Sequence, residues 1–295
     1  IMEIELYKSR SYSGCIKSAY ILFSTNLTTI FKRTWLSILV YSIPLAIMID
    51  LSLSSRALNE ADLPIPTTTL VLMSGMCIWS LAGCIWFIAI VNRILNTRTL
   101  KVNLIRATVL ILILLHVAGF VKIILQLVNT LVVSTFLSAK VSSGAATLTS
   151  TVIEILLDSA FFVALLPCTF SIIKYLIDPQ SKISDIFGKA YRHGWRHWGF
   201  LFITLFITGI IFSLIATVLF APFGIIVEAQ ISDLLGTLNG DLSGIPSNFY
   251  ILLYGTTLLT SFIFAYLVIW SSFIFYYAYG SIETTERERE KSLTA

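Results

Sequence analysis

Residues 178–198, DPQSKISDIFGKAYRHGWRHW, form the longest polar and basic interval between two apolar runs that are each long enough to cross a bilayer. Within this interval Ile183, Phe187, Ala190 and Trp195 recur at the spacing of one stripe on an α-helix. The charged side chains and the histidines fall off this stripe. The pattern is typical of a helix in the headgroup plane, with tryptophan at the acyl boundary and cations near lipid phosphate.

The polar side of this stretch is the first candidate functional surface. We expect a helix over residues 181–197, in which Ser181 or Ser184 caps the first turn. An amphipathic helix on a soluble core would show the same periodicity, but membrane spans flank this one on both sides. The histidines could share a metal ion across one helix turn, but no third ligand is evident and we expect no metal. The residues predicted to face lipid headgroups or a protein partner are Lys189, Arg192, His193, Arg196 and His197.

The composition of the whole chain is that of a membrane protein. Of its 295 residues, 57% are hydrophobic and 12% are charged, whereas soluble proteins carry about 25% charged residues. Six runs reach the roughly 20 apolar residues that span the hydrocarbon, so we predict an all-α polytopic fold and one integral membrane domain over residues 1–295. The predicted spans are residues 35–54, 67–91, 107–127, 151–176, 199–221 and 249–278.

The cysteines indicate no cross-linked or metal-bound framework. Cys15, Cys77, Cys84 and Cys168 lie in or beside predicted spans, and their spacing is not that of metal ligands. We expect free, buried thiols and no cofactor.

A second basic amphipathic stretch precedes the first span. Residues 13–32 keep the helical spacing of apolar side chains and are predicted to form another surface helix. Both stretches contain Ala-Tyr, at 19–20 and at 190–191, ahead of Trp35 and Trp198 respectively. The two stretches therefore predict a two-fold internal repeat of surface helix and span.

This arrangement, used twice in a six-span chain, resembles that of the bacterial YciC-like proteins and of the membrane domain attached to some glycerophosphodiester phosphodiesterases. The resemblance covers residues 13–48 and 183–222, and the sequence contains no catalytic phosphodiesterase portion. It implies a bacterial inner-membrane protein.

The distribution of cations predicts the orientation. With six spans, all but three of the 20 Lys and Arg residues fall on the side that carries both termini. The exceptions are Arg56, Lys122 and Lys140. The positive-inside rule then places both termini in the cytoplasm and the loops near Glu60, Ser143 and Asp241 outside.

Prolines and glycines within the spans predict bends and close contacts. Pro167 should bend the fourth span because it lacks an N–H group, and Pro222 is expected to end the fifth. Residues 223–238 would then form a separate outer amphipathic segment. Gly75 and Gly83 share one face of the second span and would let another helix approach closely.

Ionisable side chains inside the spans are the second candidate site. His116 and Lys122 fall in the third span, and Glu154 and Asp158 lie one turn apart in the fourth. Such charges are costly in a membrane and are usually paired or functional. Lys122 and Asp158 have similar predicted depths, so we expect an ion pair across the hairpin. A structural pair, a coupling site for protons or a charged substrate, and a Lys122 side chain that reaches water all remain open.

No enzyme motif accompanies these residues. We find no Walker A loop, no G-x-S-x-G elbow and no protease signature. We therefore expect a non-enzymatic inner-membrane protein, a scaffold or partner subunit of a membrane complex, anchored by basic amphipathic helices. The expected partners are the anionic lipids of the cytoplasmic leaflet and a protein partner or second copy, with no nucleic acid.

A transporter or permease subunit is the alternative. Ala190 and Gly194 match the A-x-x-x-G core of the coupling loop of ABC-importer permeases, although the rest of that motif is missing. A transporter would use a polar route past the four intramembrane residues.

Overall fold

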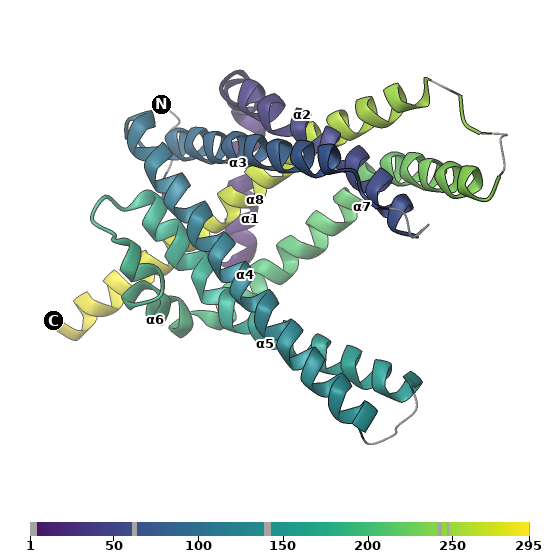
Figure 1. Ribbon diagram of the computed structural model, residues 1–295. Helices are drawn as coiled ribbons and strands as arrows, with labels where there is room; N and C mark the ends of the chain where they lie inside the picture. Colours follow the sequence, from purple (N-terminus) through teal and green to yellow (C-terminus); the bar gives the residue numbers. More distant parts are fainter. Residues whose placement is uncertain (1–4, 61–63, 139–142, 241–243, 247, 295) are drawn as a thin grey trace. The chain divides into compact units, whose positions relative to one another are not determined.

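The computed structural model describes residues 5–60, 64–138, 143–240, 244–246 and 248–294. Its regular structure in these ranges is entirely helical (Figure 1). The two predicted outer-loop residues Lys140 and Asp241 lie outside the described residues. The helices are α1 (Tyr12–Thr25), α2 (Leu27–Glu60), α3 (Thr67–Leu95), α4 (Leu100–Ser138), α5 (Ser143–Ile177), the 3-10 helix η1 (Ile183–Ile186), α6 (Lys189–Arg196), α7 (Trp198–Leu238) and α8 (Phe249–Thr294).

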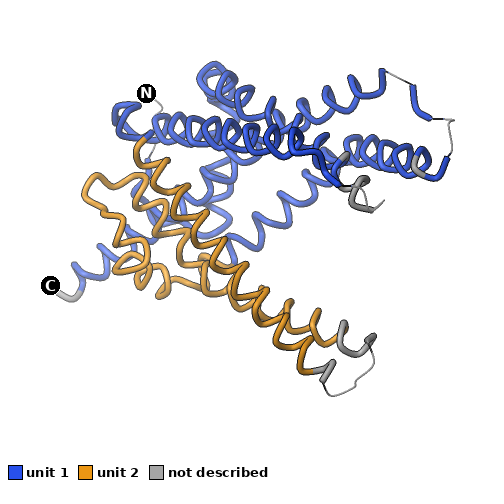
Figure 2. The backbone as a smooth tube through the Cα atoms, in the orientation of Figure 1, with its two compact units in different colours: residues 1–104, 203–295 blue, residues 105–202 orange. Residues whose placement is uncertain are grey.

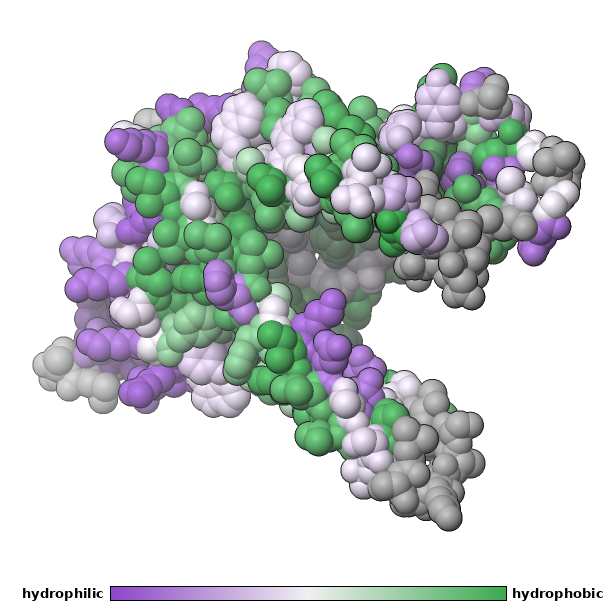
Figure 3. Space-filling model, viewed as in Figure 1, coloured by the Kyte–Doolittle hydropathy of each residue, from purple (hydrophilic) through white to green (hydrophobic). Residues whose placement is uncertain are grey.

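Six of these helices are long and apolar enough to cross a membrane, which confirms the predicted all-α polytopic class. Their apolar side chains remain largely exposed, as expected where lipid replaces water. Leu112, Leu114 and Leu115 of α4 are examples, and Figure 3 shows apolar residues over much of this helix. The apolar segments are Leu27–Leu53, Thr67–Leu95, Leu100–Thr135, Leu148–Ile177, Trp198–Thr237 and Phe249–Ser292.

Two predicted boundaries were wrong. The first surface helix ends at Thr25 rather than at residue 32, because Asn26 leaves the helical conformation and its Nδ2 donates to the Leu22 carbonyl at 3.0 Å. The following residues already belong to α2. Pro222 does not end the fifth span, since α7 continues through it to Leu238. A proline removes one backbone donor, which a long membrane helix tolerates.

The predicted surface helix at 181–197 is also divided. It forms η1 and α6, with Gly188 between them. A Cβ on Gly188 would lie 2.8 Å from the Ser184 carbonyl oxygen, so this tight bend favours glycine. Neither predicted serine caps the first turn. Lys182 is the N-cap, and its backbone N–H donates to Asp185 Oδ2 at 2.9 Å.

The chain forms two compact units, a division that the sequence analysis did not anticipate. Unit 1 comprises Ile1–Leu104 and Ile203–Ala295, and unit 2 comprises Ile105–Phe202 (Figure 2).

In unit 1, α2 packs against α3 and α8. A Cβ on Gly83 of α3 would lie 2.9 Å from the backbone N and Cα of Tyr41, which confirms the predicted close approach at this glycine. A Cβ on Gly75 would have no described atom within 4 Å. Phe31 of α2 stacks on Tyr266 of α8 with ring centroids 5.9 Å apart.

The N-terminal segment of unit 1 is fastened to α8. The Arg10 backbone N–H donates to Ser281 Oγ, and that hydroxyl donates to the Arg10 carbonyl, both at 2.8 Å. The Arg10 guanidinium also lies 4.8 Å from the centre of the Tyr277 ring. Gly280 lets the Leu6 backbone approach, since a Cβ there would overlap the Leu6 carbonyl. These contacts hold α1 on the C-terminal part of α8.

In unit 2, Arg106 of α4 closes the C-terminal end of α5. Its guanidinium donates to the carbonyls of Tyr175, Asp178 and Pro179 and lies 4.9 Å from the centre of the Tyr175 ring. A cation at this end satisfies carbonyls that have no helical donor. A small core of Leu110, Tyr175, Leu176 and Ile186 joins α4, α5 and η1 beside it.

Candidate functional site

The predicted intramembrane charge site is not assembled. Lys122, Glu154, Asp158 and His116 are all exposed, and none of them has an ion pair within the part of the chain that the structure describes. The expected pair between Lys122 and Asp158 is therefore not formed. Two residues at similar depth can still point in different directions, because depth does not determine which face of each helix carries them.

These residues have separate surroundings. Lys122 borders a largely apolar, half-open pocket of about 590 Å³ that is lined by α4, α5, η1 and Phe187 within unit 2. Nδ1 of His116 lies 2.6 Å from the Leu112 carbonyl oxygen one turn earlier in its own helix. The arrangement offers no chain of neighbouring ionisable groups among these four positions.

The predicted basic surface is present on α6. Lys189, Arg192 and Arg196 are exposed at i, i+3 and i+7, which places them on one stripe. Trp195, beside this stripe, is 50% exposed. We call these four residues the α6 basic face. On the opposite side of the helix, Ala190 and Gly194 are buried.

Pro167 explains how α6 is held. Proline has no N–H to donate to the carbonyl of Val163, and it disturbs the same helix turn of α5. Nε1 of Trp198 donates to that Val163 carbonyl at 3.3 Å. Tyr191 Oη donates to the carbonyl of the next residue, Ala164, at 2.7 Å. A side chain of α6, Tyr191, and one just after it, Trp198, thus donate to carbonyls around the proline.

Small residues allow this contact. A Cβ on Gly194 would lie 2.7 Å from the Pro167 carbonyl oxygen and 3.3 Å from the Phe170 Cβ. Burial raises the pKa of Tyr191, and the nearby Cys168 raises it further, so the tyrosine keeps the proton that it donates. The contact therefore needs glycine at 194 and a hydroxyl at 191.

The two histidines pack beside α5, whereas the cations of α6 are exposed. His193 stacks on the buried ring of Phe170 with ring centroids 5.4 Å apart. His197 lies next to it, at 5.9 Å between ring centroids. Both are only partly exposed. The structure thus divides the five predicted headgroup residues into three outward cations and two histidines that pack beside α5.

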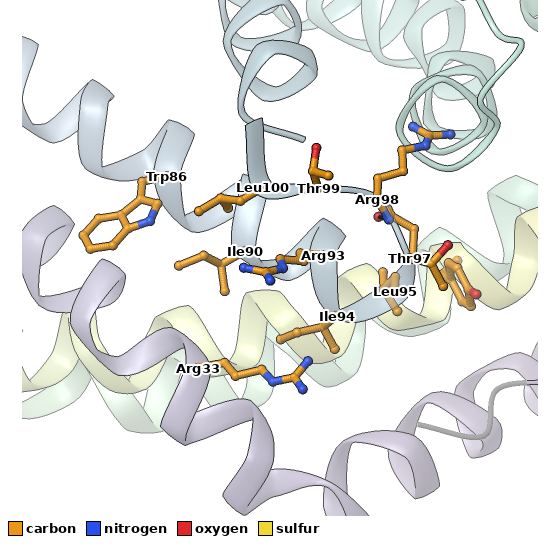
Figure 4. A pocket seen from close by; sticks show the side chains of 12 residues that line it. Arg33, Trp86, Ile90, Arg93, Ile94, Leu95, Thr97, Arg98, Thr99 and Leu100 are labelled. Carbon is orange, nitrogen blue, oxygen red and sulfur yellow. Dashed lines mark hydrogen bonds between the residues drawn. The ribbon is translucent and has the colours of Figure 1, made fainter. Parts of the chain in front are cut away.

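A second site, in unit 1, was not predicted. A pocket of about 830 Å³ lies where α3 turns into α4, and we call it the arginine pocket (Figure 4). No carboxylate is among its lining residues. These are Arg33, Trp86, Ile90, Arg93, Ile94, Leu95, Asn96, Thr97, Arg98, Thr99, Leu100 and Tyr276.

Antiparallel packing of α2 and α3 brings the arginines to this pocket. The helices meet at Tyr41 and Gly83. Arg33 lies eight residues before Tyr41, and Arg93 lies ten residues after Gly83. Both arginines are therefore about 12–15 Å from the crossing, measured along the helix axes. Figure 4 shows Arg33 and Arg93 entering from α2 and α3, and the Arg98 guanidinium directed away from them.

The turn at the rim is locked by two asparagines. Asn96 Nδ2 donates to Asn103 Oδ1 at 3.0 Å, and Asn103 Nδ2 donates back to Asn96 Oδ1 at 3.1 Å. The same Asn96 oxygen accepts from the Arg98 backbone N–H at 3.1 Å. Asn103 is fully buried. Mutually satisfied amides make the rim a fixed structure rather than a loose loop.

From the sequence, Arg33, Arg93 and Arg98 are predicted only to be cytoplasmic cations. One pattern could have revealed the pocket: Trp86, Ile90 and Ile94 form a stripe at i, i+4 and i+8 that ends beside Arg93.

Comparison with known proteins adds no relative. No family model matches the chain, and no curated protein and no solved structure gives a significant match. The resemblance to YciC-like proteins stays a prediction.

Proposed function

We propose that this multi-pass protein is a non-enzymatic scaffold or partner subunit of a complex in the bacterial inner membrane, anchored to the anionic cytoplasmic leaflet. One observation carries the proposal. The α6 basic face presents Lys189, Arg192 and Arg196 outward, while the opposite side of the helix is fastened to α5.

The chemistry of this face fits a membrane surface. Each Lys or Arg near an anionic leaflet contributes about 1 kcal/mol of binding free energy. Trp195 suits the boundary between headgroups and acyl chains. Because α6 is already held by Tyr191 and Trp198, the three cations are displayed without the cost of folding a free segment. The same rigid display would suit an acidic surface on a protein partner.

The orientation with both termini in the cytoplasm belongs to this proposal, since it places α6 on the anionic side. No contact among the described residues favours the transporter alternative, which stays a prediction.

The test is isolation of the full chain from its membrane in mild detergent. The unaltered protein should carry a stoichiometric partner or form a homo-oligomer, with anionic lipid enriched. The variant Lys189→Gln/Arg192→Gln/Arg196→Gln should lose both. A control with the same loss of charge at exposed positions, Lys101→Gln/Arg289→Gln/Lys291→Gln, should keep them.

A monomer without partner or lipid enrichment would contradict the proposal. A stoichiometric ATPase would instead support the permease alternative.

A further inference from the structure

We infer that the arginine pocket binds the phosphate of an anionic phospholipid, with the phosphate on Arg33 and Arg93 and part of an acyl chain along the apolar wall of α3. The site lies in unit 1 and does not depend on the role proposed for α6.

The charge of the pocket favours an anionic ligand. Arg33 and Arg93 line the pocket, and neither has an ion pair within the described part of the chain. With no carboxylate in the lining, the pocket is strongly cationic. A guanidinium offers several N–H donors in a planar fork that matches phosphate, and two such groups can share one phosphate.

The position of the pocket, at the ends of two candidate spans, favours a lipid. Arg93 lies two residues before the end of α3, and Arg33 lies near the start of α2. The ends of membrane helices lie at the level of the headgroups, where lipid phosphates are found.

The apolar wall of the pocket suits an acyl chain. Trp86, Ile90 and Ile94 extend along one stripe of α3 for about 12 Å. Leu95 and Leu100 add apolar surface near the rim. A free phosphate would use the two arginines but leave this wall without a partner, whereas a phospholipid satisfies both. The amide pair of Asn96 and Asn103 holds the rim in place, which lowers the entropy cost of binding.

The experiment uses the full chain in detergent micelles and native mass spectrometry. Phosphatidylglycerol, phosphatidylcholine with the same acyl chains, and inorganic phosphate are titrated separately. We expect phosphatidylglycerol to bind most tightly. Loss of one charge-assisted contact weakens binding about tenfold, so Arg33→Gln and Arg93→Gln should each have this effect and the double variant a larger one.

The matched control is Lys32→Gln/Lys101→Gln, which removes the same charge from neighbouring exposed positions that do not line the pocket. It should bind phosphatidylglycerol within twofold of the unaltered protein. Equal losses in both doubles would show a diffuse surface charge and overturn the inference. Equal binding of the two lipids would also overturn it.

Two further outcomes decide the source of the phosphate and the integrity of the fold. Inorganic phosphate that binds as tightly as the lipid, and is lost from the same double variant, would replace the lipid with a free anion. If the glutamine double does not fold, Arg33→Lys/Arg93→Lys keeps the charge without the fork. It should bind phosphatidylglycerol more weakly than the unaltered protein, and unchanged binding would overturn the inference.

Discussion

Tyr254 Oη of α8 donates a hydrogen bond to Asp50 Oδ2 of α2 at 2.8 Å, and so joins residues 204 positions apart in the chain. Both side chains are partly buried and lie within candidate membrane spans. Asp50 is thus a carboxylate within a candidate span that has a defined partner, a feature that the sequence predicted for the third and fourth spans. Asp50 lies near the end of the first apolar segment, so the hydrogen bond is expected close to one membrane face.

Removal of this donor should destabilise unit 1. Tyr254→Phe leaves a partly buried carboxylate without its hydrogen bond, which costs about 1–3 kcal/mol in free energy of unfolding. Thermal melting in detergent measures the loss. Tyr250→Phe, one turn away and exposed, is the control and should melt like the unaltered protein. Equal melting of all three proteins would show that the bond contributes no stability.

The contact between α2 and α3 gives a prediction with an internal control. Gly83→Ala places a methyl group 2.9 Å from the Tyr41 backbone, which cannot move aside as a flexible side chain would. We expect a loss of about 1–3 kcal/mol. Gly75→Ala lies on the same helix with no described atom within 4 Å of the new methyl. It should be neutral or slightly stabilising, because alanine favours the helix. The same sign for both variants in thermal melting would contradict the packing described here.

Length and apolarity identify spans without knowledge of any contact, so the six-helix class could be predicted from the sequence. Rotation about a helix axis could not. Lys122 and Asp158 were placed at similar depth, yet they lie on faces that do not pair. The arginine pocket was missed for a related reason: Arg33 and Arg93 are 60 positions apart, and only the crossing at Gly83 brings both to one end. The periodicity of α6 identified its cations, but not the bend at Gly188.

The attachment of α6 to α5 can be tested at its tightest point. Gly194→Ala sets a methyl group 2.7 Å from the Pro167 carbonyl oxygen, so α6 must move away and Tyr191 and Trp198 must weaken their bonds to α5. Hydrogen exchange at the amides of α6 should become faster, with a stability loss of about 1–3 kcal/mol. Gly199→Ala, in open space five residues later, is the control. Unchanged exchange in Gly194→Ala would show that this contact does not hold the helix.

The last prediction concerns pH and Cys15 of α1, which is fully buried and lies outside the candidate spans. Burial raises the pKa of this thiol from 9.0 to about 11, partly offset by the positive charge of Arg10. The folded protein thus prefers the neutral thiol. Its contribution to stability is complete below about pH 9, the pKa of the unfolded chain, and is lost as pH rises towards 11.

Comparison with Cys15→Ala isolates this contribution from those of all other groups, which the two proteins share. The difference in melting temperature between the two proteins should be constant below pH 9. Between pH 9 and 11 the melting temperature of the unaltered protein should fall relative to that of Cys15→Ala. Maleimide labelling offers a second measurement, because only the thiolate reacts. Labelling of folded Cys15 should be far slower at neutral pH than labelling of the unfolded chain. A constant melting difference up to pH 11, together with rapid labelling at neutral pH, would show that the thiol is not held in a buried site.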